Sequence, residues 1–208
     1  MNQPLSIVLA LTAGYLVGSI PTAYILGRLK EGIDIRTVGS RNMGAMNSFY
    51  RLGFFYGIVV ALVDVGKGAA AVWLARLLGT PDVVEMLAGA MAVVGHNWPV
   101  WLKFKGGKGG ATVIGAVGFL MPWSFPIGIP IFALILLITK APTISYGLAM
   151  LTFPVVAWFV YHRLDYVIFS VIMLLVPFIK YIPRLFEMHE KTGSWRGVFA
   201  RKSIKDRF

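Results

Sequence analysis

Long apolar runs separated by polar segments recur along this chain, and their lengths come near the roughly 20 residues with which an α-helix crosses a bilayer. This pattern predicts an all-α fold, a polytopic integral membrane protein in which residues 1–208 form one transmembrane domain. Seven spans are expected, at about residues 4–28, 52–78, 83–102, 111–122, 125–139, 143–160 and 167–179. The third apolar run stops near Val94, so Trp98 to Phe104 is expected to complete that crossing or to line its exit.

Three polar segments interrupt or end this pattern, at residues 30–51, 95–112 and 180–208. The first is rich in hydrogen-bonding side chains and has no helical apolar period, which is typical of a binding loop. It is also longer than an ordinary connection of a few residues. Composition agrees with the membrane assignment, because 57% of the residues are hydrophobic and the mean hydropathy is +0.73.

The basic residues are distributed unequally between the two expected sides of the membrane. One side carries all of the 20 Lys and Arg residues except Arg76, Arg163 and the intramembrane Lys67. Because cytoplasmic loops carry the excess of cations, the N-terminus is expected outside and the C-terminus inside. All three polar segments then face the cytoplasm. The net charge of +11 also suits anionic lipid headgroups and anionic substrates, and favours these over nucleic acid.

Some kinds of site are excluded or disfavoured. Cysteine is absent, which excludes disulfides, thiolate nucleophiles and cysteine-based zinc sites. The histidines His96, His162 and His189 lie far apart in the sequence, so no metal site is expected. The first three residues contain no Lys or Arg, so the first apolar run is interpreted as a retained span and not as a cleaved signal. The sequence specifies no oligomeric state, and a monomer is compatible with it.

The segment 95–112 reads GHNWPVWLKFKGGKGGAT and concentrates glycines and lysines within an apolar chain. Glycines allow backbone N–H groups to approach a ligand closely, and successive N–H groups form an anion-binding nest. The segment is therefore predicted to hold a phosphate. It is not a Walker loop, because Lys108 is followed by Gly109 and not by Ser or Thr. The alternative is a basic loop that only fixes the orientation in the membrane.

Two features inside the expected spans leave alternatives open. Asp64 and Lys67 lie three residues apart on one helix face, where they are either functional or a neutralising pair that locks neighbouring helices. Pro21, in GSIPT at 18–22, indicates either an ordinary helix kink or a bend that shapes a pocket.

Four stretches of this sequence resemble motifs of the bacterial acyl-phosphate:glycerol-3-phosphate acyltransferase family, the PlsY type. They are GSIPTAYILG at 18–27, DIRTVGSRNMGAMN at 34–47, DVGKG at 64–68 and the segment at 95–112. The resemblance implies a seven-span enzyme of the bacterial inner membrane with a cytoplasmic active site. It also implies transfer of a fatty acyl group from acyl-phosphate to the 1-hydroxyl of glycerol 3-phosphate, giving lysophosphatidic acid and phosphate. An acyl-phosphate is already activated, so no cofactor is expected.

The sequence departs from the family pattern in two motifs. In the first, Arg41 and Met46 stand where the family usually has Gly and Thr. In the third, FIKYIPRLFEMHE at 178–190, Arg184, Leu185 and Glu190 match the family pattern. Phe178, Tyr181 and Met188 stand where His, Asn and Gly are common, so any catalytic role of that His is not transferred.

These comparisons give a set of expected site residues. The expected catalytic residues are His96, Asn97 and Ser40. His96 is the natural general base because its ordinary pKa lies near neutrality, with a structural role, or proton transfer to a substrate phosphate, as alternatives. The expected substrate-binding residues are Arg36, Asn42, Gly44, Asn47, Lys105, Gly106, Gly107, Lys108, Gly109, Thr112, Arg184 and Glu190. Asp64 and Lys67 are expected to support them from within the membrane.

A different class, a transporter of phosphorylated solutes, would also use spans broken by Gly and Pro that carry intramembrane charges. No repeat of the two-halves kind is found, since GKG recurs at 66–68 and 107–109 without matching flanks.

Overall fold

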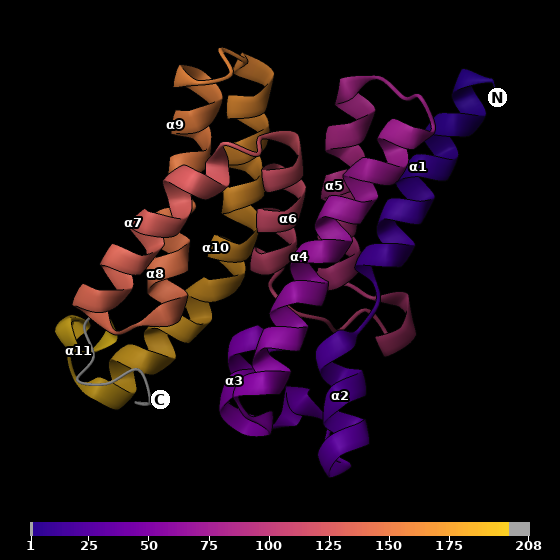
Figure 1. Cartoon of the computed structure of the whole chain (residues 1–208). Coiled ribbons are helices and arrows are strands. Elements are labelled where there is room, and N and C mark those ends of the chain that lie inside the picture. Colours follow the sequence, from indigo (N-terminus) through magenta and orange to yellow (C-terminus); the bar gives the residue numbers. More distant parts are fainter. Residues whose placement is uncertain (1, 200–208) are drawn as a thin grey trace. The chain divides into compact units, whose positions relative to one another are not determined.

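The computed structural model describes residues 2–199, and within this range all regular structure is helical (Figure 1). The all-α prediction is therefore confirmed. The chain divides into two compact units between Leu120 and Met121. Each unit is described by itself below, and the expectation of one domain over residues 1–208 stays a prediction.

The first unit contains six α-helices and two short 3-10 helices within the described residues. They are α1 (Gln3–Gly18), α2 (Thr22–Glu31), η1 (Ile35–Thr37), α3 (Ala45–Leu52), α4 (Phe54–Leu77), α5 (Asp82–Asn97), η2 (Val100–Leu102) and α6 (Gly110–Leu120). The helix α4 packs against α1, α3, α5 and α6, and α1 also packs against α5. This unit contains two of the three polar segments that were expected to contribute site residues.

Glycine lets α4 and α6 approach each other more closely than larger side chains would allow. A Cβ atom on Gly115 would collide with the backbone carbonyl oxygen of Val65, and one on Gly68 would collide with that of Thr112. Membrane helices are held together largely by such close packing, because lipid provides little hydrophobic drive for their association.

A break separates α1 from α2, so the first expected span is two helices (Figure 1). The chain leaves helical hydrogen bonding at Ser19 and resumes it at Thr22, with Pro21 at the N-cap of α2. Lys67 of α4 donates a hydrogen bond to the carbonyl oxygen of Ile20 over 3.2 Å. A freed carbonyl of the break is thus satisfied by a buried side chain, as a membrane interior requires.

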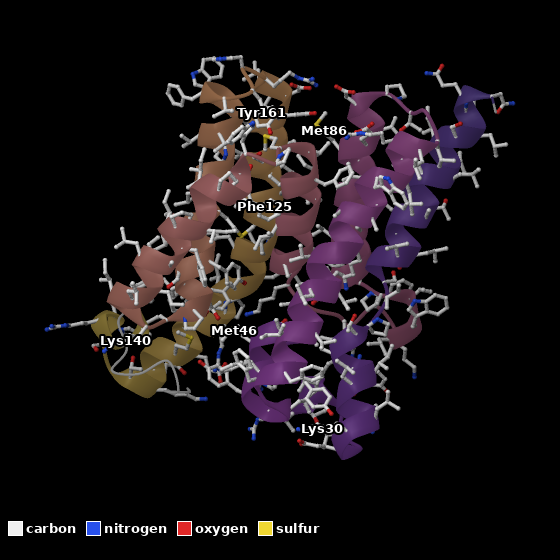
Figure 2. The ribbon with its side chains drawn as sticks, in the orientation of Figure 1. Lys30, Met46, Met86, Phe125, Lys140 and Tyr161 are labelled. Carbon is white, nitrogen blue, oxygen red and sulfur yellow. The ribbon has the colours of Figure 1, made fainter. Side chains whose placement is uncertain are left out.

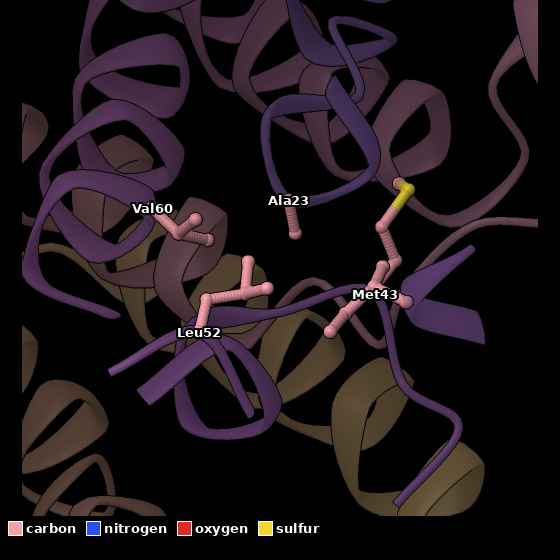
Figure 3. Close-up of a cluster of buried hydrophobic side chains, with 5 residues drawn as sticks. Ala23, Met43, Leu52 and Val60 are labelled. Atoms are coloured by element: carbon pink, nitrogen blue, oxygen red, sulfur yellow. The ribbon is translucent and has the colours of Figure 1, made fainter. Parts of the chain in front are cut away.

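The polar loop after α2 is anchored by a small apolar cluster (Figure 3). Ile35 and Met43 of the loop are 0% and 1% exposed, and they pack with Ala23, Leu52 and Val60 from three helices. This burial holds both ends of the loop, so its polar residues are fixed in position.

The second unit contains five helices within the described residues. They are α7 (Ser124–Thr139), α8 (Pro142–Ala149), α9 (Thr152–Phe159), α10 (Leu164–Thr192) and α11 (Trp195–Phe199). The helix α7 packs on α8 and α9, and α9 packs on α10. Lys140 and Tyr161 lie at opposite ends of this unit (Figure 2). At the Tyr161 end, the phenol oxygen accepts a hydrogen bond from the backbone N–H of Trp123 over 3.3 Å.

Several predicted boundaries are wrong. The segment 30–51 is not wholly a loop, because α2 continues to Glu31 and α3 occupies Ala45–Leu52. The helix within 83–102 ends at Asn97, since the chain turns at Trp98 and Pro99.

The last helix does not end at 179, because α10 continues to Thr192. Its extension is polar but carries two ion pairs at helical spacing, Arg184–Glu187 and Glu187–Lys191, which favour helix. Residues 200–208 of the expected basic tail lie outside the described residues.

Four helical stretches in the described chain are long and apolar enough to cross a membrane. They are Gln3–Glu31, which combines α1 and α2, Phe54–Leu77, Pro142–Phe159, which combines α8 and α9, and Leu164–Thr192. The apolar helices α6 and α7 are shorter. The integral membrane character predicted from the sequence agrees with these helices.

The α4–α6 contact predicts the effect of one added methyl group. Gly115→Ala should lower the free energy of unfolding by about 1–3 kcal/mol, because its Cβ meets rigid backbone. Gly66→Ala on the same helix pair is the matched control, since its Cβ would meet nothing within 4 Å. Alanine should there stabilise helix by up to about 1 kcal/mol. Thermal unfolding in one detergent compares them, and equal midpoints would contradict the close-packing argument.

Candidate active site

The glycine–lysine loop, residues 98–109, folds back onto the C-terminal end of α5. The N–H of Gly107 donates to the carbonyl oxygen of His96 over 3.0 Å, and the N–H of Gly106 donates to that of Asn97 over 3.2 Å. These bonds satisfy carbonyls that a helix end would otherwise leave without partners. The loop is therefore held directly against His96 and Asn97.

The loop glycines are required for this contact. A Cβ atom on Gly107 would collide with Nε2 of His96 and would lie 2.8 Å from the carbonyl oxygen of Met43. Gly109 has a φ of +84°, and a Cβ there would lie 2.9 Å from Oδ1 of Asn97. The sequence interpretation assigned these glycines to a phosphate nest, whereas the structure commits the N–H groups of Gly106 and Gly107 to the end of α5. This corrects that part of the prediction.

The helix α6 begins at Gly110, two residues after the half-buried Lys108, and helix N-termini attract anions. Lys105 is exposed. Thr112 is fully buried, and its Oγ1 has no hydrogen-bond partner among the described residues. Lys105, Lys108 and this helix start can therefore each contribute positive charge to an anion site.

Arg36 joins the first polar loop to the glycine–lysine loop. Its guanidinium forms a bidentate ion pair with Asp34, with Nε 3.0 Å from Oδ1 and Nη2 2.8 Å from Oδ2. Its Nη1 donates to the carbonyl oxygens of Lys105, at 3.0 Å, and Leu102, at 3.4 Å. Arg36 was expected to bind phosphate, and the structure instead directs these donors to protein oxygens.

The Arg36–Asp34 pair also explains the charge state of both groups. Hydrogen bonds from Arg36 lower the pKa of the Asp34 carboxyl below its usual value, and the same pair raises the pKa of Arg36. The Arg36 guanidinium lies 5.1 Å from the centroid of the Tyr24 ring. Arg36 is therefore held on three sides and fixes how the two loops sit together.

Asn47, at the start of α3, organises the first polar loop from inside. Its Nδ2 donates to the carbonyl oxygens of Ile35, Val38 and Asn42 over 2.9–3.0 Å, and its Oδ1 accepts from the N–H of Ser40 over 3.0 Å. Only 3% of the residue is exposed. Asn47 was expected to bind substrate, but its amide is used by the loop backbone.

The remaining expected residues of the first loop lie around this hub. Ser40 and Asn42 are half-buried, and Gly44 is buried at the N-cap of α3. Arg41 has a φ of +57°, a left-handed conformation that glycine adopts without steric cost. The family pattern has Gly at this position, and Arg41 adopts here the left-handed conformation that is typical of glycine.

Asp64, Lys67 and His96 meet inside the first unit. Oδ1 of Asp64 lies 2.8 Å from Nζ of Lys67 and 3.6 Å from Nδ1 of His96. The residues are 2%, 4% and 3% exposed, respectively. The sequence placed the pair on one helix face, but it gave no indication that His96 reaches it from another helix.

Arg184 and Glu190 lie on α10 in the second unit. Nη1 of Arg184 is 2.6 Å from a carboxylate oxygen of Glu187, and Glu190 is exposed. Two of the positions that depart from the third motif contact each other, since the hydroxyl of Tyr181 donates to Sδ of Met188 over 3.6 Å. The divergent third motif thus forms an internal contact along one face of α10.

The sequence analysis did not predict the residues that contribute to this region through an aromatic ring or a backbone carbonyl. Tyr24 and the carbonyls of Ile20 and Met43 belong to this region, and no pattern of residue types marks a carbonyl oxygen. The pairing of Asp34 with Arg36 could have been predicted, because the two residues of opposite charge lie two positions apart. No group of three or more His, Cys, Asp or Glu residues in the described part of the chain could hold a metal ion.

Comparisons with known proteins agree with one another. Residues 8–189 match the family described as glycerol-3-phosphate acyltransferase. Proteins named glycerol-3-phosphate acyltransferase 2 from two strains of Dehalococcoides mccartyi are 50% and 47% identical to this chain, with 100% of both chains covered in each case.

A solved structure is also similar, the crystal structure of PlsY (YgiH), an integral membrane glycerol 3-phosphate acyltransferase. Its glycerol 3-phosphate form has a TM-score of 0.83 and 26% identity, and the match covers 98% of this chain and 96% of that chain. By the extent of the family match and by the identity of its full-length relatives, this chain belongs to the glycerol-3-phosphate acyltransferase family.

Proposed function

We propose that this protein transfers a fatty acyl group from acyl-phosphate to the 1-hydroxyl of sn-glycerol 3-phosphate, releasing lysophosphatidic acid and phosphate. The observation that carries the proposal is the joining of the two motif loops beside His96, through Arg36 and the loop glycines. The solved PlsY structures, described as glycerol 3-phosphate and lysphosphatidic acid forms, support the same substrate and product.

The reaction needs positioning more than activation. The 1-hydroxyl oxygen attacks the acyl carbonyl carbon, an ester bond forms, and the bond from that carbon to the phosphate oxygen breaks. Phosphate leaves with the electron pair, and the hydroxyl proton goes to a substrate phosphate. Acyl-phosphate is a mixed anhydride, so a well-held acceptor hydroxyl suffices.

The substrate phosphates are assigned to the start of α6. Lys108 supplies the charge, and the first N–H groups of α6 supply directed donors. Ser40 and Asn97 supply neutral hydrogen bonds. Arg36 and Asn47 act as positioning residues, since their donors are directed into the loops.

The two polar loops face the cytoplasm in this proposal, and seven spans cross a bacterial inner membrane. Within the first unit, Lys30 and Met86 lie at opposite ends, with Lys30 at the end that carries α3 (Figure 2). Arg36 of the first loop donates to the carbonyl oxygens of Leu102 and Lys105 in the second, so the two basic loops lie together, which supports the assignment from the positive-inside rule.

The acyl donor tests the function directly. Purified protein in lipid vesicles should form lysophosphatidic acid from acyl-phosphate and glycerol 3-phosphate, whereas acyl-CoA should be inert. Release of inorganic phosphate should match product one to one. Robust turnover with acyl-CoA in the absence of acyl-phosphate would reject the proposed donor.

Lys108 tests the phosphate site. Lys108→Ala removes a charge-assisted hydrogen bond worth about 1.5–3 kcal/mol, so kcat/KM for glycerol 3-phosphate should fall about tenfold or more. Lys103→Ala is the matched control, since it removes an exposed charge from the same loop. If the lysines only orient the protein, the two variants should have equal and normal kinetics once they are correctly inserted.

Single cysteines test the sidedness, because the natural chain has none. Ser40→Cys and Lys105→Cys should resist a membrane-impermeant thiol reagent in intact cells and react after lysis. Asp82→Cys, at the exposed start of α5, should react in intact cells. Labelling of position 40 or 105 from outside would overturn the topology. Gly107 is unsuitable as a probe position, because its Cβ would collide with His96.

A further inference from the structure

The last part of α10 continues the apolar face of the part that precedes it. Exposed apolar residues recur every three or four positions along the helix, at Ile172, Leu175, Ile179, Pro183 and Phe186. Residues at this spacing lie on one face of a helix. The exposed apolar face therefore continues past position 179, where the sequence becomes polar.

The charged residues of this last part lie on another face of α10. They follow the same spacing and form a charged stripe, made of Lys180, Arg184, Glu187 and Lys191. A helix with one apolar face and one charged face is typical of the headgroup layer of a membrane, where it lies with its apolar side toward the acyl chains.

The length of α10 also places its end outside the hydrocarbon core. The helix has 29 residues. At 1.5 Å per residue it is roughly 43 Å long, against about 30 Å for the hydrocarbon core of a bilayer. Pro177 and Pro183 lie inside the helix, and proline is a common cause of helix bends. The last part of α10 can therefore leave the direction of the preceding part.

Exposed aromatic rings gather where α10 meets α11, at the end of α10 far from α9 (Figure 1). The centroid of the Trp195 ring lies 4.3 Å from that of His189, 6.0 Å from that of Phe186 and 6.1 Å from that of Phe199. Gly193, with a φ of +68°, ends α10 and lets the chain turn back. Phe186, Trp195 and Phe199 are each at least 44% exposed, and these three rings are called the aromatic surface below.

The segment that carries the aromatic surface is strongly basic. Residues 180–208 contain eight Lys or Arg residues and three Asp or Glu residues. Lys191 and Arg196 are exposed cations within this segment. Tryptophan is enriched at membrane–water interfaces, and clusters of Lys and Arg beside them attract anionic lipids. A protein partner would account for the exposed rings, but not for their continuity with the apolar face of a helix long enough to cross a membrane.

We propose that the aromatic surface and the last part of α10 lie in the headgroup layer and bind anionic phospholipids. The rings of Phe186, Trp195 and Phe199 insert toward the acyl chains, and the neighbouring cations bind lipid phosphates. On the proposed sidedness this is the cytoplasmic leaflet. The contact holds Arg184 and Glu190 of the third motif at the depth of the lipid phosphates. This inference goes beyond the proposed function and does not depend on the reaction.

Single cysteines test the depth of the aromatic surface, because the natural chain has none. Phe199→Cys and Lys191→Cys, each labelled with the fluorophore NBD, are compared in vesicles of phosphatidylglycerol and phosphatidylcholine. Lys191 is the matched control, since it belongs to the charged stripe. A nitroxide on the upper acyl chain should quench NBD more at position 199 than at 191, and aqueous iodide should quench in the opposite order. Equal or reversed orders would overturn the proposal. Phe186→Cys is a second reporter on α10 itself, in case loss of the Phe199 ring loosens α11.

The lipid preference tests the cations. At position 199, nitroxide-labelled phosphatidylglycerol should quench more than phosphatidylcholine labelled and diluted in the same way. Lys191→Gln combined with Arg196→Gln should lower this preference about fivefold or more, which is the factor expected for one cation near an anionic surface. Arg163→Gln is the control, because it removes a cation at the opposite end of α10. A preference that survives in the double variant contradicts the anionic-lipid contact.

Other occupants of the aromatic surface give different results. A second copy of the chain would shield position 199 from both quenchers, and this shielding would fade as the protein is diluted into lipid, which would overturn the proposal. All readouts are fluorescence and none is acyl transfer. Failure here therefore leaves the proposed function standing, and an inactive protein with the expected quenching would overturn the proposed function alone.

Discussion

The return of the glycine–lysine loop onto the end of α5 is the contact on which the site depends. Two N–H groups of the loop satisfy the carbonyls of His96 and Asn97, and glycine at 107 leaves room for the imidazole. A helix end inside a membrane protein needs such partners, because unsatisfied carbonyls are costly in an apolar interior. The same bonds that end the helix therefore place the imidazole ring of His96 against the loop.

The first polar loop is fixed by a different principle, hydrogen bonding from within. Asn47 serves four backbone groups, and Ile35 and Met43 hold the loop ends in an apolar cluster. Arg36 then couples this preformed loop to the carbonyls of the second. Because the donors of Arg36 and Asn47 are engaged with protein oxygens, these side chains need little reordering when a ligand binds, which lowers the entropic cost of the bound state.

Sequence reasoning predicted most of the helices, and two of the segments it expected to form the site lie against each other in the structure. The helix α7, expected at 125–139, follows from an uninterrupted apolar run, and α4, expected at 52–78, follows from an apolar run in which Asp64, Lys67 and Arg76 are the charged residues. Roles within the polar loops were harder to predict, because Arg and Asn serve a phosphate and a backbone carbonyl equally well. Only the folded loop shows that Arg36 and Asn47 face protein atoms. The extension of α10 was missed because charged residues of opposite sign at helical spacing were interpreted as a solvated tail.

The residues that depart from the family motifs are also accommodated by their local contacts. Arg41 occupies a left-handed conformation, which costs a residue with a side chain roughly 1 kcal/mol, and the loop fixed by Asn47 retains it. Tyr181 and Met188 stand at two divergent positions and contact each other, so a larger side chain at one is met by a partner at the other. Gly107 cannot be replaced by a larger residue in this way, because the space that a side chain would need is filled by the imidazole of His96. Substitutions are therefore expected to be tolerated where the new side chain can contact a neighbour, and not at Gly107, where the absence of a side chain makes room for the ring of His96.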